Sequence, residues 1–231
     1  MTTTLPDLHA ALAGEGVLTG DAWLSQALAR VAADPGALGS LFPAVGRRCG
    51  RGPLPATPGW TVDEAARVLL LAALPPDRVL PEAEAAYRYG DAAEKRAVLK
   101  ALPLLPLAGQ AVPLLRDALR TNDTRLVSAA LGPYAANLDA AAWRDGVLKC
   151  VFMGVPLAGV HGLDERADPE LVRMLDAFRR ERRAAGREVP PDALALLDRL
   201  TDRPADGSAH RATDRGTDRS TAGLTDRLEE D

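Results

Sequence analysis

The stretch that decides the fold is TVDEAARVLLLAALPP, which runs from Thr61 to Pro76. Thr61 and Glu64 have the spacing of a capping box, in which each side chain can bond the backbone N–H of the other residue. The run that follows, ARVLLLAAL, consists mostly of strong helix formers. Pro75 and Pro76 cannot continue a helix. This stretch therefore predicts a helix that begins after Thr61 and ends before the two prolines.

A second stretch, DAAEKRAVLKALPLLP (91–106), has the same organisation. Asp91 and Glu94 repeat the capping-box spacing, and VLKALPLLP (98–106) resembles VLLLAALPP (68–76). Helices packed in successive antiparallel pairs, as in HEAT repeats, produce such an internal similarity. Two copies are too few to define a repeat, so the HEAT-like arrangement is a hypothesis.

The rest of the chain also favours helices. Hydrophobic residues make up 47% of the sequence but aromatic residues only 4%, so alanine, leucine and valine must fill the core. Strands have little support, because β-branched or aromatic residues rarely alternate with polar ones. We therefore predict an all-α protein. Further helices are expected at 21–33, 36–48, 81–89, 110–121, 123–131, 139–153, 169–185 and 191–200.

The composition changes at Thr201. The triplet TDR recurs at 201, 213, 217 and 225 among small and polar residues, and bulky apolar residues nearly vanish. Such a segment cannot offset its ordering entropy by burial. We predict one α-helical domain over residues 1–200 and a disordered, low-complexity tail over 201–231.

Composition and charge also bear on location and partners. The formal net charge of −4 provides no general attraction to nucleic acid, and we expect no nucleic-acid partner. The first residues, MTTTLPDLHAALAGEG, lack the basic and apolar regions of a signal peptide. The apolar run from Cys150 to Val160 is shorter than the roughly 20 residues of a membrane helix. We therefore expect a cytoplasmic protein. Its two distant cysteines, Cys49 and Cys150, are expected to be inert thiols rather than a disulfide.

Two lysines fall in apolar surroundings. Lys149 shares a narrow polar stripe with Asp145, four residues earlier, which is the favourable order for an ion pair. The alternative for Lys149 is a contact with an anionic ligand. Lys95 projects onto the apolar face of its helix, between Leu99 and Leu102. A lysine there must extend to solvent, pair with a nearby acid, or line a cavity.

His161 is the only histidine away from the chain ends. It lies in a glycine-rich loop three residues before Asp164, which could orient it as a general base. A catalytic triad also needs a nucleophile, and neither a GxSxG motif nor a reactive-cysteine signature is present. A metal site needs more ligands. A structural, hydrogen-bonded histidine is the default, and the sequence assigns no catalytic residue, metal ligand or cofactor.

Several stretches, in this order and spacing, resemble the EboA family. They are YRYGDAAEKRAVLKALPLL (87–105), RTND (120–123), PYAANL (133–138), AWRDGVLKCVFMGVPL (142–157), HGLDERAD (161–168) and ERRAAGREVPPD (181–192). The resemblance implies a role in metabolite traffic. It also implies a gene cluster that encodes a prenyltransferase-like membrane protein and predicted hydrolase- or isomerase-like proteins. The family has no assigned catalytic centre, so no catalytic residues carry over.

These observations lead to two hypotheses. The favoured one is a non-catalytic accessory protein that helps to move a secondary-metabolite precursor out of the cytoplasm. It would bind either the metabolite or a partner protein from the same gene cluster, including the prenyltransferase-like membrane protein. The alternative is an enzyme of that pathway. The ligand-binding candidates are Arg88, Lys95, Lys149, His161 and Asp164, and the enzyme would use Lys95, Lys149 and His161. Convergence of Arg88, Lys95, Lys149 and His161 on one concave apolar pocket would favour ligand binding or catalysis, whereas their scatter over the surface would favour a scaffold.

Overall fold

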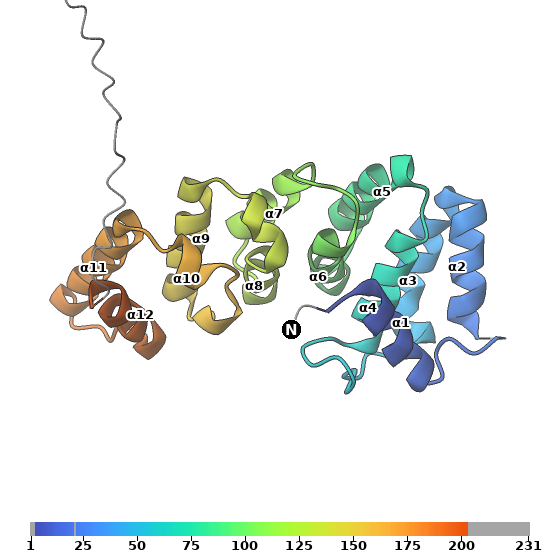
Figure 1. Cartoon of the computed structure of the whole chain (residues 1–231), viewed down its shortest axis with the longest axis horizontal. Coiled ribbons are helices and arrows are strands. Elements are labelled where there is room, and N and C mark those ends of the chain that lie inside the picture. The colour runs from blue at the N-terminus through green and yellow to red at the C-terminus, as the bar shows by residue number, and fades with distance from the viewer. Residues whose placement is uncertain (1–2, 21, 203–231) are drawn as a thin grey trace, which may run out of the picture.

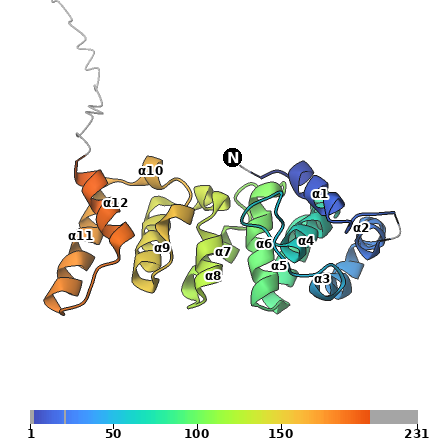
Figure 2. The same cartoon turned by 90° about the horizontal axis from the view of Figure 1, so that it is seen from below.

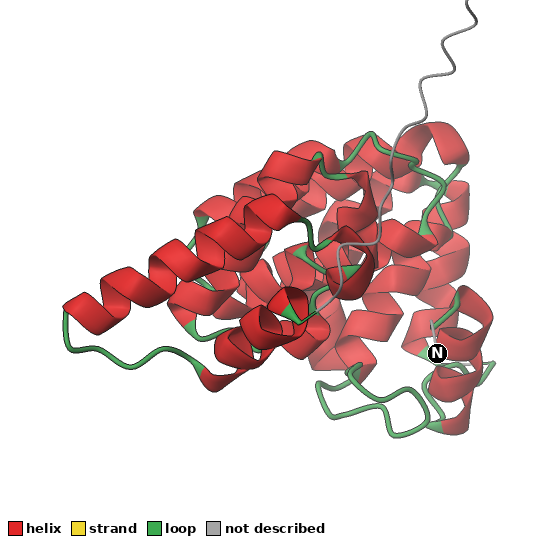
Figure 3. Cartoon of the chain, turned by 60° about the vertical axis from the view of Figure 1, so that its left-hand side comes forward, coloured by secondary structure: helices red, strands yellow, loops and turns green. Residues whose placement is uncertain are grey.

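The computed structural model describes residues 3–20 and 22–202, and the regular structure in this part of the chain is helical (Figure 3). Its one β-type pairing is an isolated bridge between Pro53 and Thr61. The prediction of an all-α fold is confirmed. The predicted tail lies outside the described residues, apart from Thr201 and Asp202 at its start.

The helices follow one another along the chain. Their bounds are α1 Leu5–Gly14, α2 Trp23–Ala33, α3 Leu38–Arg48, α4 Val62–Ala72, α5 Pro76–Tyr89, α6 Ala92–Ala101, α7 Val112–Arg120, α8 Thr124–Ala130, α9 Ala140–Met153, α10 Leu163–Arg166, α11 Pro169–Ala184 and α12 Pro191–Thr201. Short 3-10 helices at Pro35–Ala37, Leu102–Leu104, Pro133–Asn137 and Leu157–Gly159 lie between them.

Consecutive helices pack as pairs, and the pairs stack along one direction. Helix α3 packs on α4, α5 on α6, α7 on α8, and α11 on α12. The second helices of the first three pairs, α4, α6 and α8, lie next to one another, and α9 continues this row. The molecule is therefore elongated, with α1 and α2 near one end and α11 and α12 at the other (Figures 1 and 2). This stack of helix pairs agrees with the hypothesis of a HEAT-like arrangement. The two similar segments, 68–76 and 98–106, include the carboxyl-terminal halves of the neighbouring helices α4 and α6.

Helix α5 is longer than predicted. It begins at Pro76 rather than near Pro81. Proline suits the first turn of a helix because its fixed φ is preorganised and its missing N–H would have no partner there. The two prolines after α4 therefore end one helix and begin the next, and Pro81 lies inside α5.

Helix α1 was not predicted, although a local signal for it exists. Thr4 and Asp7 form a capping box, and the Thr4 backbone N–H donates to the Asp7 carboxylate over 2.8 Å. Pro6 lies within the first turn. α1 packs against α4 and thereby covers one side of that helix.

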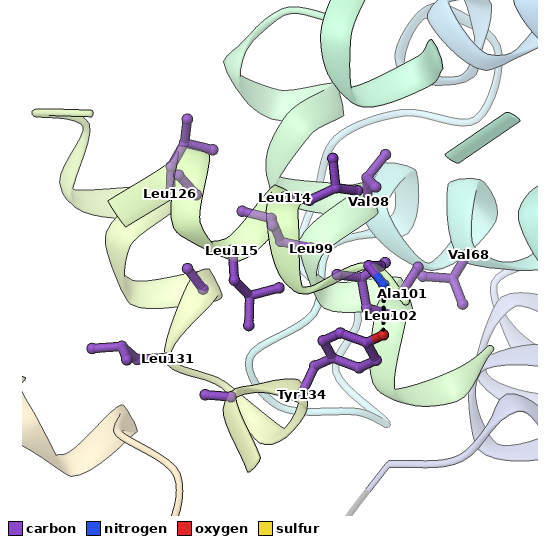
Figure 4. Close-up of a cluster of buried hydrophobic side chains, with 14 of the residues drawn as sticks. Val68, Val98, Leu99, Ala101, Leu102, Leu114, Leu115, Leu126, Leu131 and Tyr134 are labelled. Carbon is purple, nitrogen blue, oxygen red and sulfur yellow. Dashed lines mark hydrogen bonds between the residues drawn. The ribbon is translucent and has the colours of Figure 1, made fainter. Parts of the chain in front are cut away.

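Helix α4 is the centre of the fold. Its residues from Val62 to Leu71 are all buried. Leucine and valine side chains from α4 pack with those from α6, α7 and α8 in a continuous cluster (Figure 4). The Tyr134 hydroxyl closes this cluster and accepts a hydrogen bond from the Ala111 backbone N–H over 3.1 Å. In residues 3–20 and 22–202, no helix has the length and apolar character that a membrane crossing requires.

Candidate functional site

Buried charges gather where α4 meets α3 and α6. Arg67 is only 1% exposed, and its Nη1 lies 2.6 Å from the Asp63 carboxylate, one turn earlier on α4. Its Nε donates to the Phe42 carbonyl over 3.3 Å, and its guanidinium lies 5.5 Å from the centre of the Phe42 ring. Glu94 of α6 is 3.8 Å from Nη2. A buried arginine is tolerated when its donors are engaged, and three different groups engage this one.

Glu64 is the second buried acid of α4. One carboxylate oxygen accepts from the Thr61 backbone N–H, as the capping box predicted, and also from Lys100 of α6. The other oxygen lies 2.8 Å from Nη1 of Arg96. Glu64 therefore fixes the start of α4 and holds two cations of α6 at the same point.

Lys100 has an unusual environment for a lysine. Its ammonium donates to the Gly59 carbonyl over 2.7 Å and lies 4.0 Å from the centre of the Trp60 ring. These contacts tie the 50–60 loop to α6. Burial lowers the pKa of the Lys100 ammonium, and the neighbouring Glu64 carboxylate opposes this shift.

A cavity of about 510 Å³ opens beside these cations. It lies along α6, the α6–α7 connection and α8. It is lined by Thr3, Gly59, Trp60, Arg96, Leu99, Lys100, Pro103, Leu104, Ser128, Ala129, Gly132, Pro133 and Gly159. Its volume falls in the range of small-molecule sites, which are roughly 300–1,000 Å³. The described lining is mostly apolar and includes two cations but no acidic residue.

The first two predicted ligand-binding residues lie outside this cavity. Arg88 is exposed on α5. Lys95 is half-buried on α6, with its ammonium 5.3 Å from the centre of the Tyr87 ring. Tyr87 is itself held by a 2.9 Å hydrogen bond from its hydroxyl to Asp117. Lys95 therefore covers an aromatic ring near the surface.

The other three candidates lie in the second half of the chain. Lys149 lines a hollow of about 300 Å³ between α7 and α9. The expected ion pair between Asp145 and Lys149 is not formed, so that interpretation is wrong. His161 and Asp164 line another hollow, of about 460 Å³, and Asp164 lies 3.1 Å from Nη1 of Arg199.

His161 is anchored through its backbone. Its N–H donates to the Leu131 carbonyl over 2.8 Å, and its own carbonyl accepts from the Trp143 indole over 3.3 Å. As a whole, His161 is exposed. Of the five candidates, the structure brings only His161 and Asp164 to the same hollow. In the described residues, no group of three or more His, Cys, Asp or Glu side chains could hold a metal ion.

The residues that do meet at the 510 Å³ cavity were missed from the sequence. Arg96 and Lys100 are one turn apart on α6, which is a local signal that they share a face. Their significance depends on Glu64 and Trp60, which lie on a distant stretch of chain. Helical periodicity does not report such contacts.

The fold and this cavity define a class of protein: a stack of helix pairs with a small, mostly apolar pocket that has a cationic edge. Residues 48–198 match the family described as metabolite traffic protein EboA. The chain belongs to the EboA family, which confirms the resemblance drawn from its motifs and supports a role in metabolite traffic. No curated protein and no solved structure matches the chain.

Proposed function

We propose that this protein is a non-catalytic accessory protein that binds a secondary-metabolite precursor during its transfer out of the cytoplasm. The cavity beside Trp60 and Lys100 is the observation that supports this role, because it is concave, mostly apolar and large enough for a small molecule. Family membership supports the connection with metabolite traffic. Transfer to other proteins of the same gene cluster, including the prenyltransferase-like membrane protein, stays a prediction.

The enzyme hypothesis has less geometric support. It required Lys95, Lys149 and His161 to act together. Lys95 lies over Tyr87, whereas Lys149 and His161 line two separate hollows. A catalytic acid or base must lie within hydrogen-bonding reach of the group it serves, directly or through one water.

Native mass spectrometry of the full chain, purified without denaturation, tests the proposal. We expect a small molecule to remain bound to the wild-type protein. Ser128→Trp places a bulky ring in the cavity from an exposed position on α8 and should remove that molecule. Ala141→Trp adds the same bulk at an exposed site on α9 outside the cavity lining and should retain it.

Three outcomes would contradict the proposal. Retention of the molecule by Ser128→Trp would place the binding site elsewhere and overturn the assignment of this cavity. The absence of any bound molecule from the wild-type protein would contradict a metabolite-binding role. Conversion of the released molecule when it is added back to fresh protein would establish the enzyme instead.

A further inference from the structure

The edge of the cavity presents two cations, and their shared carboxylate partner lies behind them. Arg96 and Lys100 share Glu64 as their ion-pair partner. The Glu64 side chain is only 4% exposed, whereas Lys100 is 15% and Arg96 36% exposed. The acid therefore lies behind the two cations, and the cations face the cavity.

The other acids of this region are already engaged. Asp63 pairs with Arg67, and Glu94 lies 3.8 Å from the same guanidinium. One oxygen of Glu64 accepts hydrogen bonds from the Thr61 N–H and Lys100, and the other forms the ion pair with Arg96. In the described residues, no carboxylate lines the cavity to balance Arg96 and Lys100.

Arg96 has donors to spare. Its one ion pair in the described part of the chain runs through Nη1 to Glu64. A guanidinium carries five N–H donors in a planar fork that suits a carboxylate, sulfonate or phosphate. An anionic group at this edge would meet the remaining donors of Arg96 beside the Lys100 ammonium.

The rest of the cavity suits an apolar body. Trp60 is half-buried, with Lys100 stacked over its ring. Leu99, Pro103 and Leu104 continue the apolar surface from α6 into the next connection. Apolar contact supplies most of the binding free energy in such sites, while a few polar groups set the orientation.

We infer that the cavity binds an organic acid whose anionic group lies against Arg96 and Lys100 and whose apolar body lies along Trp60, Leu99 and Leu104. This inference rests on the proposed function and adds the chemical class of the ligand. A neutral ligand of the same shape would shield the remaining N–H donors of Arg96 from water without supplying an acceptor for them, and burying a polar donor without a hydrogen bond is unfavourable.

Two fluorescent probes with the same skeleton test the charge. 8-Anilinonaphthalene-1-sulfonate carries an anionic group that N-phenyl-1-naphthylamine lacks, and both fluoresce more strongly in apolar surroundings. We expect the full-length protein to bind the sulfonate at least about tenfold more tightly, as a charge-assisted hydrogen bond allows. Arg96→Gln should weaken sulfonate binding by about tenfold and change binding of the neutral probe by less than about twofold.

Matched variants separate this inference from the proposed function. Arg88→Gln removes an exposed arginine outside the cavity lining and should change neither affinity. Ser128→Trp should abolish binding of both probes. Melting temperatures of all variants check that each one is folded.

The outcomes are distinguishable. Equal affinities of the wild-type protein for the two probes, or an Arg96→Gln variant whose preference for the sulfonate is as large as that of the wild type, would overturn the organic-acid ligand while leaving a cavity that binds a metabolite. Failure of the wild-type protein to bind the sulfonate would also overturn it. If Ser128→Trp left both affinities unchanged, the probes would bind elsewhere, and the cavity would lose its assigned role as well.

Discussion

The region from α3 to α6 and the region from α9 to α12 use different chemistry at their helix contacts. All the buried polar or charged residues of the described chain lie in the first half, at Thr57, Asp63, Glu64, Arg67 and Glu94. The buried side chains of α9 to α12 are apolar, and the ion pairs there are at least partly exposed. Similar helix pairs therefore form with or without buried charge.

This difference bears on the purpose of the charges. Removing an ion pair from water costs free energy that the attraction between the ions often fails to recover. Since apolar contacts suffice between α9 and α12, packing alone does not require Arg67 and Glu64. Glu64 lies directly behind the edge of the 510 Å³ cavity, where it pairs with both Arg96 and Lys100. We interpret Glu64 as a rigid support that positions these two cations.

The largest expected effect is in the apolar region. Trp143 of α9 is 1% exposed, and the Arg166 guanidinium lies 4.8 Å from its ring. Trp143→Ala should lower the free energy of unfolding by about 3–5 kcal/mol, because it leaves a large void in the core. Urea denaturation measures this loss. Phe152→Ala, on the same helix but 75% exposed, should change stability by less than about 0.5 kcal/mol. Similar losses for both variants would show that α9 does not pack as described.

The charged region should respond to the loss of one partner. Arg67→Met strands Asp63 and Glu94 and should destabilise the protein by about 3 kcal/mol. We expect the lower end of the usual range, because Asp63 still accepts from the Thr61 hydroxyl and Glu94 from the Asp91 N–H. Denaturant titration measures the change.

Two further variants sharpen this result. Arg180→Met removes a 70% exposed partner of Asp176 and should cost less than about 1 kcal/mol. Adding Asp63→Leu to Arg67→Met should restore part of the lost stability, because it removes one stranded charge. A double variant that is less stable than the single one would contradict this explanation of the loss.

The helix starts could be predicted because their signals are local. Asp91 caps α6 through the N–H of Glu94, three residues later, and Asp168 caps α11 through the N–H of Leu171. A periodic apolar run after each cap then identifies the helix. The similarity between the ends of α4 and α6 suggested helix pairs only as a hypothesis, because two copies are too few to define a repeat.

The candidate site could not be predicted in the same way. Lys100 reaches Glu64 and Gly59 across 36 and 41 residues of chain, and Arg67 reaches the Phe42 carbonyl across 25. Lys95 was a candidate because it lies on an apolar helix face, yet a flexible lysine can cover a ring at the edge of that face. The sequence shows that a lysine lies among apolar residues, whereas the lining of the cavity depends on contacts between elements that are distant in the sequence.

Cysteine reactivity offers a chemical comparison of the two regions. Burial raises the pKa of the Cys49 thiol to about 11, against the opposing effect of Arg67. Burial also raises the pKa of Cys150 to about 12, and Asp192 adds to the shift. Only the thiolate is nucleophilic, and Cys150 is buried whereas Cys49 is partly exposed, so at pH 9 we expect Cys49 to react faster than Cys150.

Iodoacetamide labelling of the native protein, followed by peptide mass spectrometry, measures both rates. Denatured protein supplies the control, because both thiols should then react at similar rates. Faster labelling of Cys150 in the native protein would mean that the region from α9 to α12 opens more readily than the region around Cys49.

The smallest expected effect is at Lys95, which lies in the charged region but has no carboxylate partner. Its ammonium lies 5.3 Å from the centre of the Tyr87 ring, and it forms no ion pair in the described part of the chain. Lys95→Met keeps an unbranched side chain over that ring and should lower stability by no more than about 1 kcal/mol, the value of an exposed cation–π contact.

Lys100→Met is the matched control. It removes one of Glu64's partners and the bond to Gly59 and should cost about 2 kcal/mol. Thermal and urea denaturation of the two variants, together with the amount of metabolite exported, separates the outcomes. A loss at Lys95 as large as that at Lys100 would indicate an ion pair that forms in solution. A Lys95→Met protein with wild-type stability that no longer supports export would instead place Lys95 in a binding site, and the cavity beside Lys100 would then not be the sole site of function.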